Sequence, residues 1–110
     1  MRTLVYRVAA RRDLNRIAHQ LAVGSGSGSG SGSEAIGQRF VDRLIRRCER
    51  LAALGGTLGT VHEEFGPGLR TVSVGRYVIL LRYTSDWLEI VRVVHAHRDI
   101  TKVLARGRAR

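Results

Sequence analysis

Hydrophobic and polar residues alternate over the first stretch of the chain, and their spacing then becomes helical. In TLVYRV, residues 3–8, every second residue from Leu4 to Val8 falls on one apolar face, which predicts a β-strand. In ARRDLNRIAHQLA, residues 10–22, apolar residues recur every three or four positions. This spacing predicts a short amphipathic helix directly after the strand.

A longer helix is predicted over residues 34 to about 54. Its apolar stripe begins at Ile36 and ends at Leu51, and the glycine pair that soon follows supplies a stop. The two predicted helices are separated by GSGSGSGSGS, residues 24–33, in which no side chain is able to bury apolar area. We interpret this segment as a flexible linker within a single domain spanning residues 1–110. Its strict alternation favours an engineered origin, and the alternative is a natural repeat expansion in a tolerant surface loop.

In the second half of the chain, apolar residues recur at every second position. LRTVSV, RYVILLRY and LEIVRVV predict three strands, and Gly75 and the TSD sequence at 84–86 separate them. The order β-α-α-β-β-β predicts an α+β fold, with a helical hairpin packed on one face of a small, mainly antiparallel sheet. Residues 77–81 are apolar at successive positions, as in a strand covered on both faces. Two helices cover only one face, so we expect the other to expose apolar side chains unless a partner covers it.

The charge of the chain narrows the class of partner. Lys and Arg total 19 against 9 Asp and Glu, a formal net charge of +10, which favours an acidic protein or a polyanion. Five arginines fall on the polar side of the second predicted helix and form a basic stripe. It is either a solvated helix face or a surface for acidic protein or backbone phosphate. The basic stripe consists of Arg39, Arg43, Arg46, Arg47 and Arg50.

The single cysteine and the hydropathy pattern indicate the cellular compartment in which the protein is expected. Cys48 has no partner for an intramolecular disulfide and lies on the apolar stripe of the second helix, so we expect a buried core residue and not a nucleophile. The N-terminal residues alternate and lack the apolar run of a signal peptide, and no apolar run approaches the length of a bilayer span. The expected location is the cytoplasm, with no membrane partner.

Titratable residues gather where the last predicted strand ends, in VRVVHAHRDI, residues 91–100. Such clusters occur at catalytic sites and also wherever a strand reaches water. His95 and His97 point the same way on a strand, as two metal ligands do, but His19 and His62 are isolated elsewhere. We therefore expect no metal and no other cofactor.

Four segments together resemble one protein family. They are YRVAARRDLNRIAHQLA, RFVDRLIRRCERLA, FGPGLRTVSVGRYVILLRY and IVRVVHAHRDI, and they resemble the ParE branch of the RelE/ParE toxins of bacterial type II toxin-antitoxin modules. The most specific parts are GLR at 68–70, GRYVILLRY and RVVHAHRD. The resemblance implies a β-α-α-β-β-β fold. It also implies a ParD-like antitoxin of ribbon-helix-helix type, whose C-terminal segment wraps the toxin and is typically acidic.

This superfamily contains two activities. RelE-like members cut messenger RNA in the ribosomal A site without a metal, whereas ParE-like members inhibit DNA gyrase without that nuclease site. In the nucleases a C-terminal tyrosine or histidine commonly transfers protons; here no tyrosine follows Tyr83, and its expected place falls near Leu104. The resemblance therefore favours a gyrase inhibitor that is not an enzyme, with a RelE-like endoribonuclease as the alternative and a toxin made inert by the linker as a third possibility. The catalytic candidates in the nuclease alternative are Arg70, His95, His97 and Arg98.

A second set of residues is predicted to bind the antitoxin or the target. Trp87 follows a predicted turn, where it is either an anchor for a partner or a turn-packing residue. Non-specific contact with nucleic acid is also expected from the charge, because the sequence carries no base-reading motif. The binding candidates are the basic stripe together with Arg76, Trp87 and Arg98.

Overall fold

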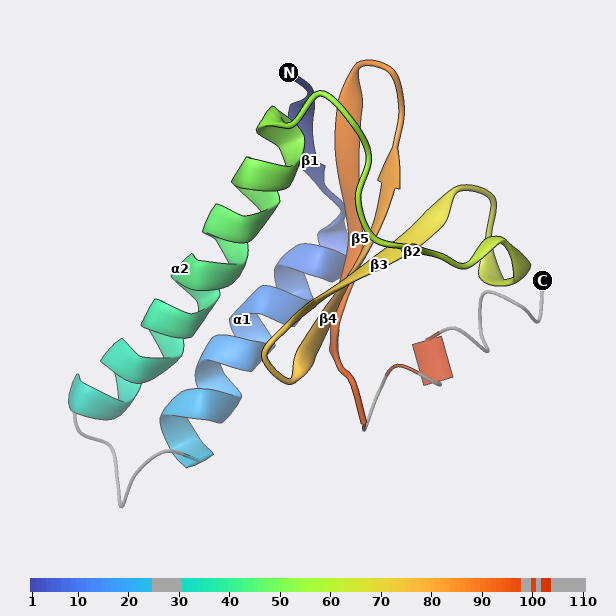
Figure 1. The fold of residues 1–110 in the computed structure, drawn as a ribbon. Coiled ribbons are helices and arrows are strands. Elements are labelled where there is room, and N and C mark those ends of the chain that lie inside the picture. The colour runs from blue at the N-terminus through green and yellow to red at the C-terminus, as the bar shows by residue number, and fades with distance from the viewer. Residues whose placement is uncertain (25–30, 98–99, 101, 104–110) are drawn as a thin grey trace.

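A helical hairpin covers one face of a five-stranded sheet in the computed structural model (Figure 1), which describes residues 1–24, 31–97, 100, 102 and 103. The strands lie in the order β1-β5-β4-β3-β2; β1 is parallel to β5, and the other pairs are antiparallel. The predicted α+β fold is confirmed. The elements are β1 (Thr3–Tyr6), α1 (Val8–Gly24), α2 (Ser31–Ala53), β2 (Thr60–Val61), the 3-10 turn η1 (Glu63–Phe65), β3 (Leu69–Val74), β4 (Tyr77–Tyr83) and β5 (Trp87–His95).

The two helices reach further than their apolar stripes predict. α1 includes Gly24 and α2 includes residues 31–33 of the predicted linker, whose residues 25–30 lie outside the described part of the chain. Packing of the hairpin, more than intrinsic propensity, decides where such helices end. The hairpin is tight at Gly37, where a Cβ atom would overlap the carbonyl oxygen of Ala18. No helix in the described residues is both long and apolar enough to cross a membrane.

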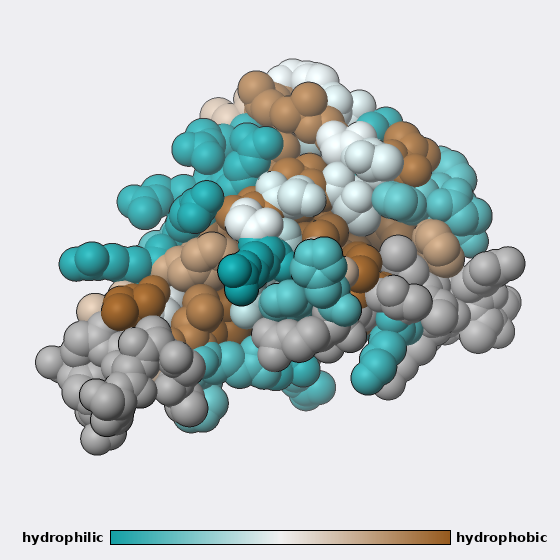
Figure 2. All heavy atoms as spheres, turned by 60° about the horizontal axis from the view of Figure 1, so that its bottom comes forward, coloured by the Kyte–Doolittle hydropathy of each residue, from teal (hydrophilic) through white to brown (hydrophobic). Residues whose placement is uncertain are grey.

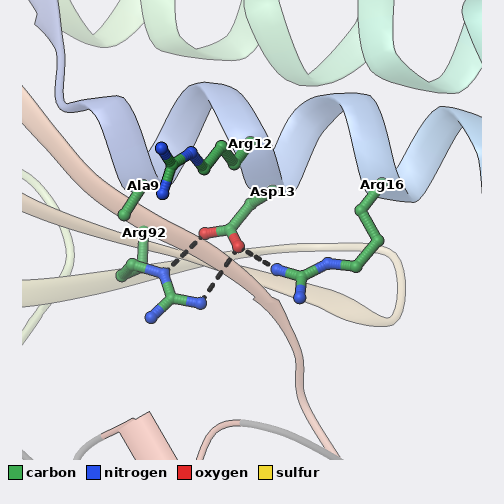
Figure 3. A pocket seen from close by; sticks show the side chains of 5 residues that line it. All are labelled: Ala9, Arg12, Asp13, Arg16 and Arg92. Atoms are coloured by element: carbon green, nitrogen blue, oxygen red, sulfur yellow. Dashed lines mark hydrogen bonds and ion pairs between the residues drawn. The ribbon is translucent and has the colours of Figure 1, made fainter.

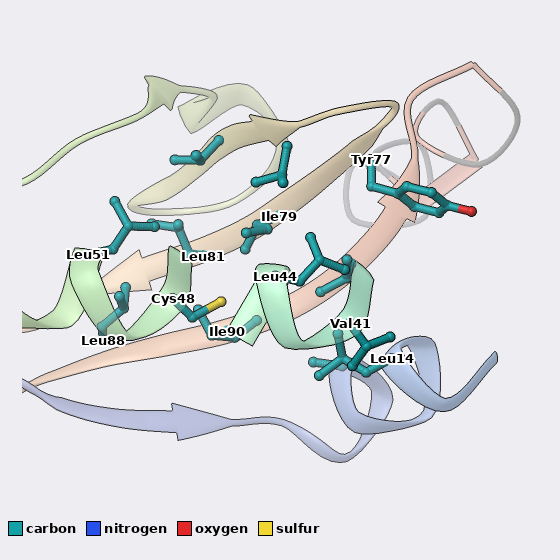
Figure 4. Close-up of a cluster of buried hydrophobic side chains, with 14 of the residues drawn as sticks. Leu14, Val41, Leu44, Cys48, Leu51, Tyr77, Ile79, Leu81, Leu88 and Ile90 are labelled. Atoms are coloured by element: carbon teal, nitrogen blue, oxygen red, sulfur yellow. The ribbon is translucent and has the colours of Figure 1, made fainter. Parts of the chain in front are cut away.

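The main core lies between the hairpin and the sheet (Figure 4). Leu44 and Leu51 of α2 meet leucine and isoleucine side chains of β4 and β5, all of them buried. Cys48 is 2% exposed within this cluster, so its predicted core position is confirmed. Burial raises the pKa of the Cys48 thiol to about 11. Burial, with the neighbouring Cys48, also raises the pKa of the Tyr6 hydroxyl.

The opposite face of the sheet is less open than the sequence pattern predicts. Val78, Leu80 and Val94 are buried there in a second cluster, against which Phe65 and parts of the C-terminal segment pack. The expectation of an exposed apolar face was therefore wrong for these positions. The physical reason is that Phe65 of η1 and, beyond β5, Ile100 and Val103 pack over this face. A strand pattern contains no information about which segment returns to cover it.

One buried carboxylate joins α1 to the edge of the sheet. Asp13 is 1% exposed, and it accepts hydrogen bonds from the Arg92 Nε at 2.7 Å, the Arg92 Nη2 at 3.0 Å, the Val93 N–H at 2.9 Å and the Arg16 guanidinium (Figure 3). Pairing between β1 and β5 ends just before this point, where the Arg7 N–H donates to the Ile90 carbonyl. Asp13 therefore satisfies an edge N–H of β5 that no strand reaches.

We predict that Asp13→Ala destabilises the protein by roughly 3 kcal/mol, because it leaves Arg92 without its carboxylate and the Val93 N–H without an acceptor. Urea denaturation followed by circular dichroism measures the change. Asp42→Ala is the matched control, since Asp42 is exposed and bonds only Gln38. It is expected to change stability by less than about 0.5 kcal/mol. Equal effects of the two substitutions would contradict a structural role for Asp13.

The raised pKa of Cys48 predicts a pH-dependent loss of stability. The unfolded thiol ionises first as pH rises above its ordinary pKa of 9.0, whereas the folded thiol stays neutral up to about 11. The stabilising contribution is thus complete below pH 9 and lost as pH rises through 11. The unfolding free energy of the parent is expected to fall more between pH 8 and pH 11 than that of Cys48→Ala. An identical pH dependence in both proteins would refute this assignment.

Candidate functional site

The basic stripe lies on α2, where most of its arginines are exposed and Arg47 is half-buried. Arg43 lies over the ring of Phe40, with its guanidinium carbon 5.8 Å from the ring centroid. On the face drawn in Figure 2, hydrophilic residues (teal) are interspersed with apolar ones (brown). The α2 arginines therefore remain available for contact with an acidic or polyanionic surface.

A row of aromatic rings connects α2 to the end of β5. Phe40 meets Tyr77 with ring centroids 5.3 Å apart, and Tyr77 meets His95 edge-on, also at 5.3 Å. The row continues to His97 at 6.0 Å from His95. Tyr77 and His95 are opposite each other in the β4–β5 ladder, and Gly75 in the preceding turn has a φ of 58°, which favours glycine.

Two arginines join this row and complete a sheet-end cluster. The guanidinium of Arg43 lies over the ring of Phe40, the first ring of the row. The exposed Arg76 precedes Tyr77, and its backbone carbonyl accepts the Ala96 N–H at 2.9 Å. The structure thus brings part of the basic stripe to the histidine-rich strand end. The sheet-end cluster consists of Phe40, Arg43, Arg76, Tyr77, His95 and His97.

The hydrogen bonding of His95 limits its chemistry. Its Nδ1 accepts the backbone N–H of His97 at 3.1 Å. A neutral imidazole in this arrangement carries its proton on Nε2, and a proton on Nδ1 would remove the bond. His95 therefore has a structural task at the end of β5, where it holds the turn that leads out of the sheet.

The nuclease candidates are not gathered at one point in the described residues. Arg70 is half-buried on β3 opposite Leu81, and its guanidinium donates to the Gly59 carbonyl at 3.3 Å. Tyr77, which pairs with His95, is four residues away from Leu81 along β4, or roughly 13 Å at about 3.3 Å per residue. Arg98 lies outside the described residues. Arg70 is thus separated from the two histidines along the sheet.

The remaining candidates lie elsewhere. Trp87 begins β5, at the opposite end of that strand from His95, and it is 48% exposed. Its backbone N–H donates to the Thr84 hydroxyl at 2.9 Å. The His62 Nδ1 lies 3.3 Å from a carboxylate oxygen of Glu64. Within the described part of the chain, no three His, Cys, Asp or Glu side chains converge as metal ligands do.

Sequence reasoning missed the arginines around Asp13. Arg12, Asp13 and Arg16 look like ordinary polar positions on α1, and Arg92 like an outward residue of a strand. Only the unpaired edge of β5 beyond Ile90 explains why they meet. The sequence offers one indication of this contact. Asp13 is a single acidic residue among several arginines in an amphipathic helix.

Comparison with known proteins identifies the family. The model of the ParE toxin of the type II toxin-antitoxin system, parDE, matches residues 4–100. A solved structure described as a chromosomal ParDE toxin-antitoxin system from P. aeruginosa has a TM-score of 0.70 at 18% identity, covering 88% of this chain and 98% of that chain. The toxin-antitoxin complex RelBE2 from Mycobacterium tuberculosis has a TM-score of 0.43 at 22% identity, covering 86% and 96%. A search of curated proteins found no match. The chain belongs to the ParE toxin family of type II toxin-antitoxin systems.

Proposed function

We propose that this toxin inhibits DNA gyrase by binding it and not by catalysis. The observation that carries the proposal is the family match over residues 4–100 to the ParE toxins. The position of Arg70, well separated from His95 and His97 along the sheet, supports a binding function over a nuclease. On this view the exposed arginines of α2 and the ring of Trp87 contact the target or the antitoxin.

A ParD-like antitoxin of ribbon-helix-helix type neutralises the toxin in this proposal. A net charge of +10 and the exposed basic stripe suit the acidic C-terminal segment that the resemblance implies. The described fold also matches that of a chain in a ParDE system. The complex is expected to form in the cytoplasm, where gyrase acts.

The alternative is a RelE-like endoribonuclease. The sheet-end cluster favours it, because Arg43 lies over Phe40 in the row of rings that leads to the two histidines, and arginines stabilise charge on a phosphate under attack. Two observations weigh against it. The tyrosine of the cluster, Tyr77, is only 6% exposed, and the Nδ1 of His95 already accepts a hydrogen bond. Burial limits access to the Tyr77 side chain, and the bonded Nδ1 removes one of the two His95 nitrogens from proton transfer.

The discriminating experiment compares the two targets with one preparation of protein. Purified toxin is added to a gyrase supercoiling assay and to ribosomes programmed with a message. We expect loss of supercoiling, with the message intact, and recovery of supercoiling when the antitoxin is added. Cleaved message together with unaffected gyrase would reverse the assignment in favour of the nuclease.

The histidines provide an independent test. The double substitution His95→Gln and His97→Gln is expected to leave growth inhibition within about twofold of the parent, since a gyrase inhibitor has no proton to transfer at these positions. A nuclease that relied on them would lose about a hundredfold or more. His19→Gln with His62→Gln is the matched control for the loss of two imidazoles. Circular dichroism of both variants separates misfolding from loss of activity, and a large loss confined to the folded sheet-end variant would refute the binding function.

A further inference from the structure

A second group of arginines surrounds Asp13, on the opposite side of α1 from the helix–helix interface. They line an open hollow of about 360 Å³ between the first turns of α1 and strand β5. Figure 3 shows Arg16 and Arg92 joined to Asp13 by dashed lines, while Arg12 extends toward the start of the helix with no such line. The arginine hollow is lined by Ala9, Arg12, Asp13, Arg16 and Arg92.

The carboxylate in this hollow has no acceptor capacity left. Its two oxygens have about four lone-pair positions, and they accept from Arg92 twice, from Arg16 once and from the Val93 N–H once. Asp13 is also 1% exposed, so it presents almost no negative surface to solvent. Three guanidinium groups against one carboxylate leave the hollow with a formal charge of +2.

Arg12 is the group that this arrangement leaves for a ligand. Figure 3 marks no hydrogen bond or ion pair between Arg12 and the other residues of the hollow, and the first turn of α1 contains no acidic residue. The Arg16 side chain is 55% exposed and gives one nitrogen to Asp13. Planar guanidinium donors on one open wall are suited to grip an oxyanion in bidentate fashion.

The positive surface continues beyond this hollow. A neighbouring hollow of about 600 Å³ shares Ala9 and Arg92 with it and adds Arg7, whose side chain is 54% exposed. The Nε of Arg7 lies 3.9 Å from Glu89, at the outer limit of an ion pair, and Glu89 is equally far from Arg82. The two adjoining hollows together hold Arg7, Arg12 and Arg16, and we call them the arginine groove. The positive surface is therefore more extended than a pocket for a single ion.

We propose that this arginine groove binds the phosphodiester backbone of nucleic acid without reading its sequence. Within the arginine hollow, where Arg12 and Arg16 lie, the only apolar side chain among the lining residues is that of Ala9. A protein partner requires apolar or aromatic anchors in well-packed pockets, whereas backbone phosphate requires only donors and positive charge. An acidic peptide is the competing ligand, since Tyr6, Val8 and Val91 line the second hollow and Val8 is 65% exposed. The proposal is separate from gyrase inhibition and is tested without gyrase.

The test measures binding of a random-sequence DNA duplex to the purified protein by fluorescence anisotropy as salt is increased. Each phosphate contact contributes about 0.9 to the slope of log affinity against log salt. Arg12→Ala is expected to lower the slope by about 0.9, and Arg7→Ala with Arg12→Ala by about 1.8. Arg12→Lys is expected to retain the slope of the parent. Arg16 and Arg92 are left intact because they hold Asp13.

Lys102→Ala is the control, as it removes one positive charge from an exposed position that belongs neither to the arginine groove nor to the basic stripe. A slope that is unchanged in this control and reduced in Arg12→Ala supports binding of backbone phosphate at the arginine groove. Equal reductions in both variants would show a diffuse electrostatic effect and overturn the proposal, as would an Arg12→Ala slope equal to that of the parent. The proposal also requires duplex DNA to bind at least about tenfold more tightly than polyglutamate of matched charge. Equal or stronger binding of polyglutamate assigns the groove to an acidic protein instead.

Discussion

The contact between Asp13 and the edge of β5 is the constraint on which the arrangement of helices and sheet depends. Strand β1 pairs with β5 only as far as Ile90, and the chain then turns into α1. A carboxylate from the second turn of that helix accepts the Val93 N–H and two nitrogens of Arg92. Because a buried charge is tolerated only when it is paired and hydrogen-bonded, this contact fixes α1 against one point of the sheet. The hairpin partner α2 then follows through packing at Gly37.

The register of β4 and β5 decides what lies at the other end of the sheet. A bulge between Leu80 and Leu81 shifts the pairing, so that Tyr77 is opposite His95. Phe40 of α2 completes the row of rings, and Arg43 covers it. The β3–β4 register places Arg70 opposite Leu81, at a distance from the histidines. Among the described residues, Arg70 and the two histidines therefore occupy separate parts of the sheet.

Arginine serves two different purposes in this protein. Arg92 and Arg16 satisfy a buried carboxylate, and their role is structural even though they line an open hollow. Arg12 and most of the basic stripe are exposed and suited to partners. The distinction matters for mutagenesis, because charge removal at the first pair destabilises the fold, whereas removal at the second group reports on binding.

The sequence by itself determined the order and type of the principal elements, the helical hairpin, the family and the core position of Cys48. The elements and the position of Cys48 follow from the spacing of apolar residues, which depends on local burial. The family follows from the sequence motifs. It did not determine the two-residue strand β2 or the segments that cover the second sheet face, because neither has a periodic pattern of its own. It also did not determine which charges meet. Asp13 and Arg92 are 79 positions apart, and only the end of the β1–β5 ladder and the packing of α1 bring them together. Contacts of this kind depend on register and on the direction in which an element packs, and the tertiary structure alone decides both.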